Sequence, residues 1–198
     1  MTRIDSNLAV PPIQPYARMR RPVAEYYRMY ELGLIDVETF ERSEIIDGEL
    51  VRKMSIGDRH AWIVTFLTRF FILNLPESIQ VHGQNPLRLG DYDEPEPDIV
   101  LSDLTKYDGK RHPTPAETIL VIEVAESSLR TDRTTKLSLY ATNEISESWI
   151  VNIPNRIVEV YTKPELGVYG STEIFEPGSI LTSGHLPEIS LPVGDLFS

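Results

Sequence analysis

The feature that most restricts the fold of this chain is an apolar run near its centre, Thr118-Ile-Leu-Val-Ile-Glu-Val-Ala125. The run does not alternate between apolar and polar residues, so a strand formed from it would bury both of its faces. Strands of this kind lie in sheets that are covered on both sides. We therefore expect an α/β protein in which residues 118–125 form a central strand.

Glu123 is the one carboxylate in that run. Burying it without a partner would cost several kcal/mol. Three arrangements avoid this cost: an ion pair with Arg or Lys, a place at the solvated end of the strand, or a bound metal ion. From Glu123 alone, the ion pair and the solvated end together outweigh the metal.

Asp98 changes this balance because it also introduces a buried-looking strand, Pro97-Asp98-Ile-Val-Leu101. If the two strands are neighbours, both carboxylates converge on one point. They would then repel each other unless one is protonated or a cation bridges them. Oxygen ligands suit Mg²⁺ or Mn²⁺. A cation held in this way can polarise a phosphodiester and lower the pKa of a bound water.

Lys136 is a third candidate, on a helix expected over residues 127–141 directly after the central strand. Asp132, Lys136 and Tyr140 are spaced four residues apart, which places them on one stripe of that helix. From there Lys136 could reach back to the carboxylates and orient an attacking water. The alternative is a surface ion pair between Asp132 and Lys136, which would contribute little.

Other segments give local structural signals. Pro22 suits the first turn of a helix that runs to Leu32. Asp47-Gly48, between two strand-like runs, predicts a hairpin because both residues tolerate positive φ. Residues 58–75 predict a helix that is buried except for one narrow polar stripe. The remaining strand predictions are residues 79–82, residues 86–89, and a hairpin of residues 147–153 and 156–161.

The formal net charge of −11 argues against a protein that covers DNA with a broad basic face. It does not exclude a nuclease, because carboxylates that hold divalent cations contribute to this acidity. No P-loop, dinucleotide fingerprint or GxSxG motif is present in the sequence. His82, His112 and His185 lack the spacing of metal ligands.

The chain of 198 residues has no cysteine, so disulfides and thiolate zinc sites are excluded. We find no apolar run of membrane-spanning length and no signal-like N-terminus. A cytoplasmic protein without membrane contact is expected. Residues 1–20 have several prolines and no apolar periodicity, which predicts a flexible arm. Residues 21–198 are expected to form a single domain.

Several segments occur in a fixed order that is more specific than any one of them. In chain order they are Glu44-Ile-Ile-Asp47-Gly48-Glu49, Ser55 to His60, Pro97-Asp98, Ile122-Glu123-Val124, Ser127-Ser128, Asp132, Lys136, Tyr140 and the hairpin from Trp149 to Tyr161. This series resembles the putative restriction endonuclease family, abundant in cyanobacteria, of the PD-(D/E)XK nuclease superfamily. The resemblance covers about residues 24 to 165.

The resemblance implies a restriction-endonuclease-like mixed β-sheet flanked by helices, with additional β-hairpins. It also implies endonucleolytic hydrolysis of DNA that depends on Mg²⁺, with Mn²⁺ as a substitute. Asp98 and Glu123 would be metal ligands. The superfamily places a lysine two residues after the glutamate, where this chain has Ala125. Lys136 on the following helix is then the catalytic lysine.

Glu44 and His60 are further candidates, Glu44 as a metal ligand and His60 as a supporting residue. Either could complete the metal shell or position a phosphate. The alternatives are that Glu44 is a solvated strand residue and that His60 bonds locally in the first turn of its helix. Asp132 and Tyr140 are expected to support the site.

Three functions are compatible with these residues. The leading one is an endonuclease with DNA as its substrate, acting as a homodimer so that two sites face the duplex. The second is a catalytically inactive nuclease-fold module that binds a cation or a protein or nucleic-acid partner; the acidity and the displaced lysine favour it. The third is a structural protein in which arginines neutralise Asp98 and Glu123.

Overall fold

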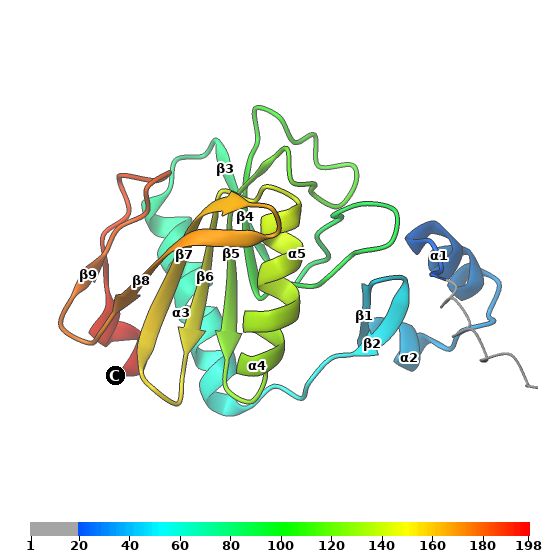
Figure 1. The fold of residues 1–198 in the computed structure, drawn as a ribbon, viewed down its shortest axis with the longest axis horizontal. Helices are drawn as coiled ribbons and strands as arrows, with labels where there is room; N and C mark the ends of the chain where they lie inside the picture. The colour runs from blue at the N-terminus through cyan, green and yellow to red at the C-terminus, as the bar shows by residue number, and fades with distance from the viewer. Residues whose placement is uncertain (1–19) are drawn as a thin grey trace, which may run out of the picture.

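The computed structural model describes residues 20–198, whose main element is a six-stranded mixed sheet (Figure 1). The strand order is β3-β4-β5-β6-β7-β8. Strands β5 and β6 run parallel, and the other neighbours are antiparallel. The strands are β3 (Ile79–Gly83), β4 (Ile99–Asp103), β5 (Thr118–Ala125), β6 (Glu147–Asn152), β7 (Ile157–Glu165) and β8 (Val168–Phe175).

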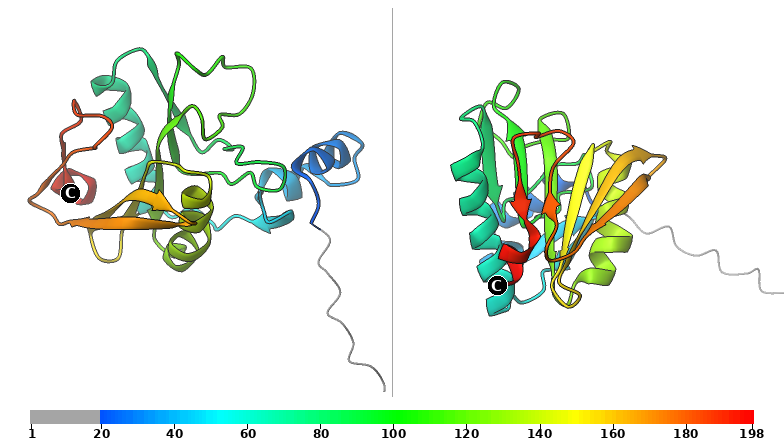
Figure 2. Two further views of the ribbon diagram at one scale, coloured as in Figure 1. Left: turned by 45° about the horizontal axis from the view of Figure 1, so that its top comes forward. Right: turned by 90° about the vertical axis from the view of Figure 1, so that its left-hand side faces the viewer.

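Strand β5 lies inside this sheet and is buried from Leu120 to Ala125, as its apolar sequence predicts. Helix α3 (Asp58–Asn74) and the C-terminal 3₁₀ helix η2 (Val193–Phe197) cover one face of the sheet. Helix α5 (Leu137–Thr142) covers the other face (Figure 2). The α/β class and the covered central strand are therefore confirmed.

The predicted helix over residues 58–75 is present, but its predicted burial is wrong. One face of α3 packs on the sheet through Ile63, Leu67 and Phe71. Trp62 and Leu73 are instead exposed, because no element within residues 20–198 covers the outer face. The apolar residues of this helix exceed what one sheet face can bury.

The N-terminal elements lie beside the sheet and have their own small apolar cluster of Val23, Tyr26 and Ile45 (Figure 1). The predicted hairpin is confirmed, with Asp47 at φ 52° and Gly48 at φ 70° in its turn. These elements are α1 (Val23–Glu31), α2 (Val37–Glu41), β1 (Ser43–Ile46) and β2 (Glu49–Arg52). Of the arm predicted for residues 1–20, residues 1–19 lie outside the described residues.

The helix that follows β5 has a wide turn in its middle. It consists of α4 (Leu129–Thr131), the π-helix η1 (Asp132–Lys136) and α5. Both Asp132 and Lys136 are buried in η1. π-turns are rare and often occur at functional sites.

The remaining elements complete the cover of the sheet. The predicted hairpin over residues 147–161 is confirmed as β6 and β7. The strand predicted at residues 86–89 is wrong, because Leu87 and Leu89 are buried in a loop that bonds to its own residues Pro95 and Asp93. Two short strands, β9 (Ile180–Leu181) and β10 (Leu191–Pro192), pair near the C-terminus. None of the helices within residues 20–198 has the length and apolarity needed to cross a membrane.

Candidate active site

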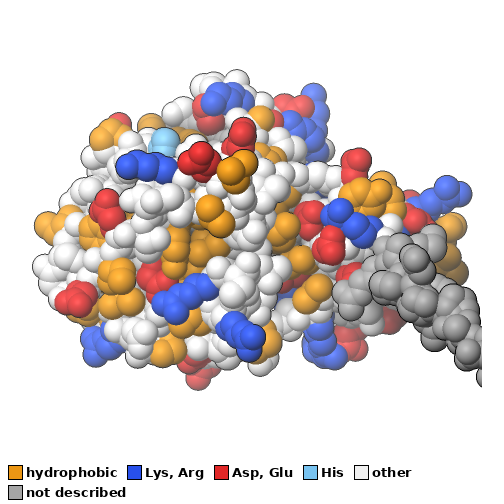
Figure 3. Space-filling view, viewed as in Figure 1, with side chains coloured by type: hydrophobic (Ala, Val, Ile, Leu, Met, Phe, Trp, Pro, Cys, Tyr) orange, Lys and Arg blue, Asp and Glu red, His pale blue; other side chains and the backbone are white. Residues whose placement is uncertain are grey.

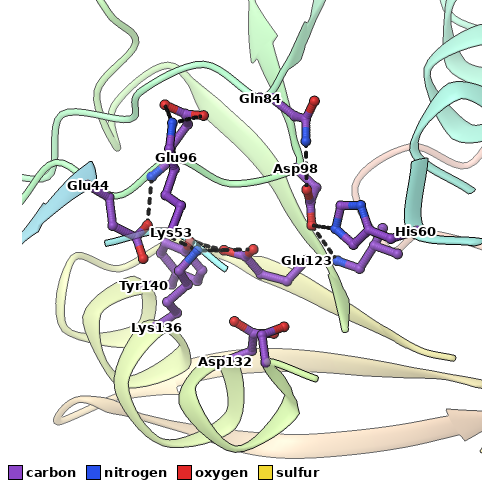
Figure 4. Close-up of polar contacts among 12 residues, drawn as sticks. Glu44, Lys53, His60, Gln84, Glu96, Asp98, Glu123, Asp132, Lys136 and Tyr140 are labelled. Atoms are coloured by element: carbon purple, nitrogen blue, oxygen red, sulfur yellow. Dashed lines mark hydrogen bonds and ion pairs between the residues drawn. The ribbon is translucent and has the colours of Figure 1, made fainter. Parts of the chain in front are cut away.

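Asp98 and Glu123 come from neighbouring strands, as their sequence context predicts. Ile99 pairs with Ile122, so Asp98 comes opposite Glu123 at the end of the antiparallel pair β4–β5. The carboxylate of Asp98 accepts a hydrogen bond of 2.7 Å from the backbone nitrogen of Val124. This bond fixes Asp98 on the strand that contains Glu123 (Figure 4).

Two side chains from other elements hold the carboxylate of Asp98. Nε2 of His60, in the first turn of α3, lies 3.1 Å from Asp98 Oδ2, and Gln84 Nε2 lies 3.4 Å from Oδ1. The alternative that His60 bonds only locally is therefore wrong. Nδ1 of His60 is buried and has no hydrogen-bond partner in the part of the chain that the structure describes. Burial alone would lower the pKa of His60, but its hydrogen bond to Asp98 and the Asp98 charge raise it above the usual value.

Lys136 points toward Glu123 and not toward solvent. Its Nζ lies 3.2 Å from Glu123 Oε1 and 3.3 Å from Oε2. The same nitrogen lies 3.1 Å from Glu44 Oε2, so it bridges two carboxylates. Tyr140, one helical turn further on, donates a hydrogen bond to Glu123 Oε1. Each of these groups is buried.

Asp132 is also buried, but it does not form the surface pair with Lys136 that was the alternative. Its carboxylate accepts a hydrogen bond of 2.6 Å from Ser128. Burial raises the pKa of Asp132. Asp132 therefore adds a negative charge to the interior of the site without neutralising the lysine through contact.

Glu44 is held from two sides. Its Oε2 accepts a bond of 3.1 Å from the backbone nitrogen of Glu96, in addition to its contact with Lys136. The side chain of Glu96 in turn pairs with Lys53 Nζ at 2.8 Å. Glu44 is buried, so its interpretation as a solvated strand residue is wrong. Lys53, Gln84 and Glu96 were not predicted as site residues, because their segments have no helical or strand periodicity.

The site contains more negative than positive charge. Burial raises the pKa of Glu123 well above its usual value; the Lys136 charge opposes this shift, while Asp132 and Asp98 add to it. Burial would lower the pKa of Lys136, but Glu123, Glu44 and Asp132 raise it above the usual value, so the amine is protonated. A second cation would relieve the remaining repulsion.

Whether the site can hold a hard metal ion such as Mg²⁺ depends on how its carboxylate and histidine side chains converge. Within residues 20–198, no three His, Cys, Asp or Glu side chains are arranged to hold a metal together. Glu44 does not converge with Asp98 and Glu123, because Lys136 lies between Glu44 and Glu123. Mg²⁺, however, is often bound by one or two carboxylates and several waters. Asp98 and Glu123 fit that pattern.

The arginine neutralisation expected of a purely structural protein is not observed. Glu123 is contacted by Lys136 and Tyr140, and Asp98 by His60, Gln84 and the Val124 backbone. No arginine of residues 20–198 forms an ion pair with either carboxylate.

Comparison with known proteins gives the family. Residues 23–194 match the model of the Uma2 family, which is described as "putative restriction endonuclease". The chain belongs to the Uma2 family. The resemblance predicted from the ordered motifs is thus confirmed, and Uma2 membership supports a nuclease function. No curated protein matches the sequence.

Five chains of solved structures also match the fold. One is the crystal structure of a putative nuclease belonging to DUF820 from Anabaena variabilis ATCC 29413. It is 19% identical, with a TM-score of 0.65 over 84% of this chain and 94% of that one. This likeness shows that the Uma2 chain has the fold of that protein, a mixed sheet flanked by helices with extra hairpins.

Proposed function

We propose that this Uma2 protein is a metal-dependent endodeoxyribonuclease with Asp98, Glu123 and Lys136 as its catalytic residues. The observation that carries the proposal is the contact of Lys136 Nζ with both oxygens of Glu123, on the strand that also holds Asp98 through Val124. A lysine beside two acidic strand residues is the arrangement that the superfamily resemblance implies. Here the lysine comes from the helix after β5.

Asp98 and Glu123 are the residues that would hold Mg²⁺ or Mn²⁺. When bound, such an ion supplies Lewis-acid stabilisation of a phosphodiester and lowers the pKa of a water. The excess negative charge around Glu123 supports this assignment, because a divalent cation would compensate for it.

Lys136 is proposed as a hydrogen-bond donor and not as a base. Its pKa is raised by the carboxylates around it, so the amine keeps its proton at neutral pH. A protonated amine can orient the attacking water and stabilise charge on the phosphate oxygens. Glu44 accepts from the same nitrogen and thereby limits the positions of the amine. We assign Glu44 this positioning role in place of metal ligation.

The supporting residues restrict the two carboxylates. Tyr140 donates to Glu123, and His60 contacts Asp98. Partners of this kind orient ligands, and their loss typically reduces metal affinity or activity by roughly 10–100-fold.

The experiment is plasmid cleavage by the full chain with Mg²⁺ or Mn²⁺. Asp98→Asn and Glu123→Gln are expected to lower the cleavage rate by about a hundredfold or more while the proteins remain folded. Glu173→Gln is a matched control, because Glu173 is an exposed carboxylate of β8. If Asp98→Asn and Glu123→Gln cut DNA as well as the parent, the assignment is wrong.

The second candidate function is an inactive module that binds a cation. The position of Lys136 between Glu44 and Glu123 favours it, because the amine that would assist cleavage is already paired with both carboxylates. Calorimetry with Mg²⁺ and Mn²⁺ beside cleavage assays on supercoiled, linear and single-stranded DNA separates the two functions. Metal binding without cleavage of any substrate would support the module.

A further inference from the structure

A basic hollow of about 530 Å³ lies between helix α1 and the loops on either side of β4. None of its lining side chains carries a carboxylate, in a chain whose net charge is −11. Figure 3 shows Lys and Arg side chains scattered among Asp and Glu on one face, without a broad basic area. A local cluster is therefore notable. The lining residues are Tyr27, Arg88, Lys110, Arg111 and His112, with Gly109 and Thr114.

Two buried carboxylates orient the arginines of this hollow. Arg111 makes two hydrogen bonds to Glu117, of 2.7 and 3.2 Å, and the Nε of Arg88 donates to Glu94. Glu94 and Glu117 are buried, whereas the side chains of Arg88 and Arg111 are 34% and 49% exposed. The carboxylates thus hold the guanidinium groups from behind and leave them accessible at the hollow.

Lys110 contributes a further cation. Its side chain is exposed and forms no ion pair with any of residues 20–198, while the Asp108 carboxylate accepts a hydrogen bond of 3.1 Å from its backbone nitrogen. Fixed guanidinium groups with an adjacent free ammonium are the donors that proteins use for phosphate oxygens.

The hollow borders the candidate active site through one shared residue. Tyr27 also lines a second hollow of about 290 Å³, whose wall includes Gln84 and four glutamates (Glu41, Glu44, Glu94 and Glu96) but no Lys or Arg. Gln84 contacts Asp98, and Glu44 contacts Lys136. A polyanionic chain that passes Tyr27 would therefore be attracted to the basic hollow and repelled by this acidic wall.

We propose that the basic hollow binds the phosphate backbone of the nucleic-acid substrate, beside the position that is cut. The inference rests on the proposed nuclease function. It names the contact that would hold the nucleic-acid strand in a fixed position relative to the cleavage site. Phosphate contacts position a nucleic acid without reading its sequence. A small protein with a net charge of −11 needs such contacts close to its site.

DNA binding tests the proposal separately from cleavage. Anisotropy of a labelled DNA oligonucleotide is titrated with the full chain in EDTA over a series of salt concentrations. Lys110→Glu is expected to weaken binding about tenfold at low salt. It is also expected to reduce the slope of log affinity against log salt by about one, the value for one phosphate contact.

Arg69→Glu is the matched control, because it makes the same charge change at an exposed α3 residue without an ion pair among residues 20–198. Its affinity is expected to stay within about twofold of the parent. Because Lys110 has no internal partner, neither variant should alter the thermal melt. If Lys110→Glu does change the melting temperature, Lys110→Gln is used in its place. The DNA affinity of Lys110→Gln is expected to be about threefold lower than that of the parent.

The outcomes separate this inference from the proposed function. Equal effects of Lys110→Glu and Arg69→Glu, or no DNA binding by the parent, would overturn the hollow as a backbone site. ATP that binds the parent more tightly than the DNA, in a manner dependent on Lys110, would overturn it in favour of a nucleotide site. Binding of DNA that depends on Lys110, together with no cleavage by the parent, leaves the inference standing while the nuclease proposal fails.

Discussion

Two buried glutamates on strands of the same sheet pair with cations from the same π-turn. Glu123 is 4% exposed and contacts Lys136, and Glu159 is 2% exposed and contacts Arg133 at 2.9 Å. Their environments nevertheless differ. Burial raises the pKa of Glu123, and the nearby Asp132 and Asp98 raise it further. At Glu159 the effect of burial is outweighed by hydrogen bonds from Arg133, Tyr161 and Asn152, and the pKa is lowered.

The comparison shows what distinguishes a structural ion pair from a candidate site. Glu159 accepts hydrogen bonds from one cation, Arg133, and from two neutral donors, Asn152 and Tyr161, which compensate its charge. Around Glu123, which accepts from Lys136 and Tyr140, the lysine is shared with Glu44, and the charges of Asp98 and Asp132 lie nearby without a lysine or arginine of their own. A buried charge by itself is weak evidence of function. Unbalanced buried charge is stronger evidence, because folding alone would not favour it.

Cleavage should show the largest difference between the two glutamates. Glu123→Gln is expected to lower the cleavage rate by about a hundredfold or more, since it removes a charge proposed to hold the metal. Glu159→Gln should keep the rate per folded molecule within about twofold. Plasmid nicking followed over time gives both values. Equal losses of cleavage rate in the two variants would mean that Glu123 has no role in cleavage that Glu159 lacks.

Lys136→Met is expected to lower cleavage by about a hundredfold, because it removes a donor aimed at the site. Binding of Mn²⁺, measured by calorimetry, should remain. Arg133→Met makes the matched change three residues earlier and should leave cleavage nearly unchanged. If Lys136→Met retained full activity, the lysine would belong with Arg133 among the structural cations.

Tyr140→Phe is expected to weaken Mn²⁺ binding about tenfold, since the hydroxyl donates to Glu123 and fixes its orientation. Tyr161→Phe removes the equivalent hydroxyl from Glu159. That change should leave Mn²⁺ affinity as in the parent. Calorimetric titration of both variants makes the comparison, and a shift of the same size in each would contradict it.

Stability should respond in the opposite order. Glu159→Gln is expected to cost about 2 kcal/mol, because it leaves Arg133 without its partner. Glu123→Gln should cost no more than about 0.5 kcal/mol, since it also relieves repulsion from Asp98 and Asp132. Urea unfolding followed by circular dichroism measures both. A larger loss in Glu123→Gln would mean that its charge is needed for folding.

The pH dependence of stability can be compared at Glu117, a second buried carboxylate that is paired with an arginine. Its hydrogen bonds to Arg111, together with those from Thr114, outweigh burial and lower its pKa to about 2. A lowered pKa stabilises the fold above the ordinary glutamate pKa of 4.5, and this contribution is lost as the pH falls toward 2. Arg111→Gln should therefore cost about 1 kcal/mol at pH 7 and nearly nothing near pH 2. Urea melts at both pH values test this.

The sequence predicted the parts of the site that depend on strands. The apolar run around Glu123 required a covered strand, and the proline-led strand after Asp98 could pair beside it. The order of motifs gave the family. Homodimer formation, the cytoplasmic location and the single domain over residues 21–198 stay predictions.

Contacts that depend on side-chain direction or on distant loops could not be predicted. The orientation of Lys136 follows from a π-turn that has no sequence signature in Asp132 to Lys136. His60 reaches Asp98 across 38 residues of sequence. Arg88 and Lys110 come from different loops, so their common hollow had no periodic signal.

The π-turn at Asp132–Lys136 also has a consequence for how such proteins diverge. A turn closed by i→i+5 bonds holds about one residue more than an α-helical turn. Deleting one residue, such as Thr134, would therefore restore α-helical winding while the segments on the two sides of the turn keep nearly the same relative orientation. The lysine would then stay on the side of the helix that faces Glu123. Within one lineage, the number of residues between the glutamate and the lysine can therefore change by one without separating these two side chains.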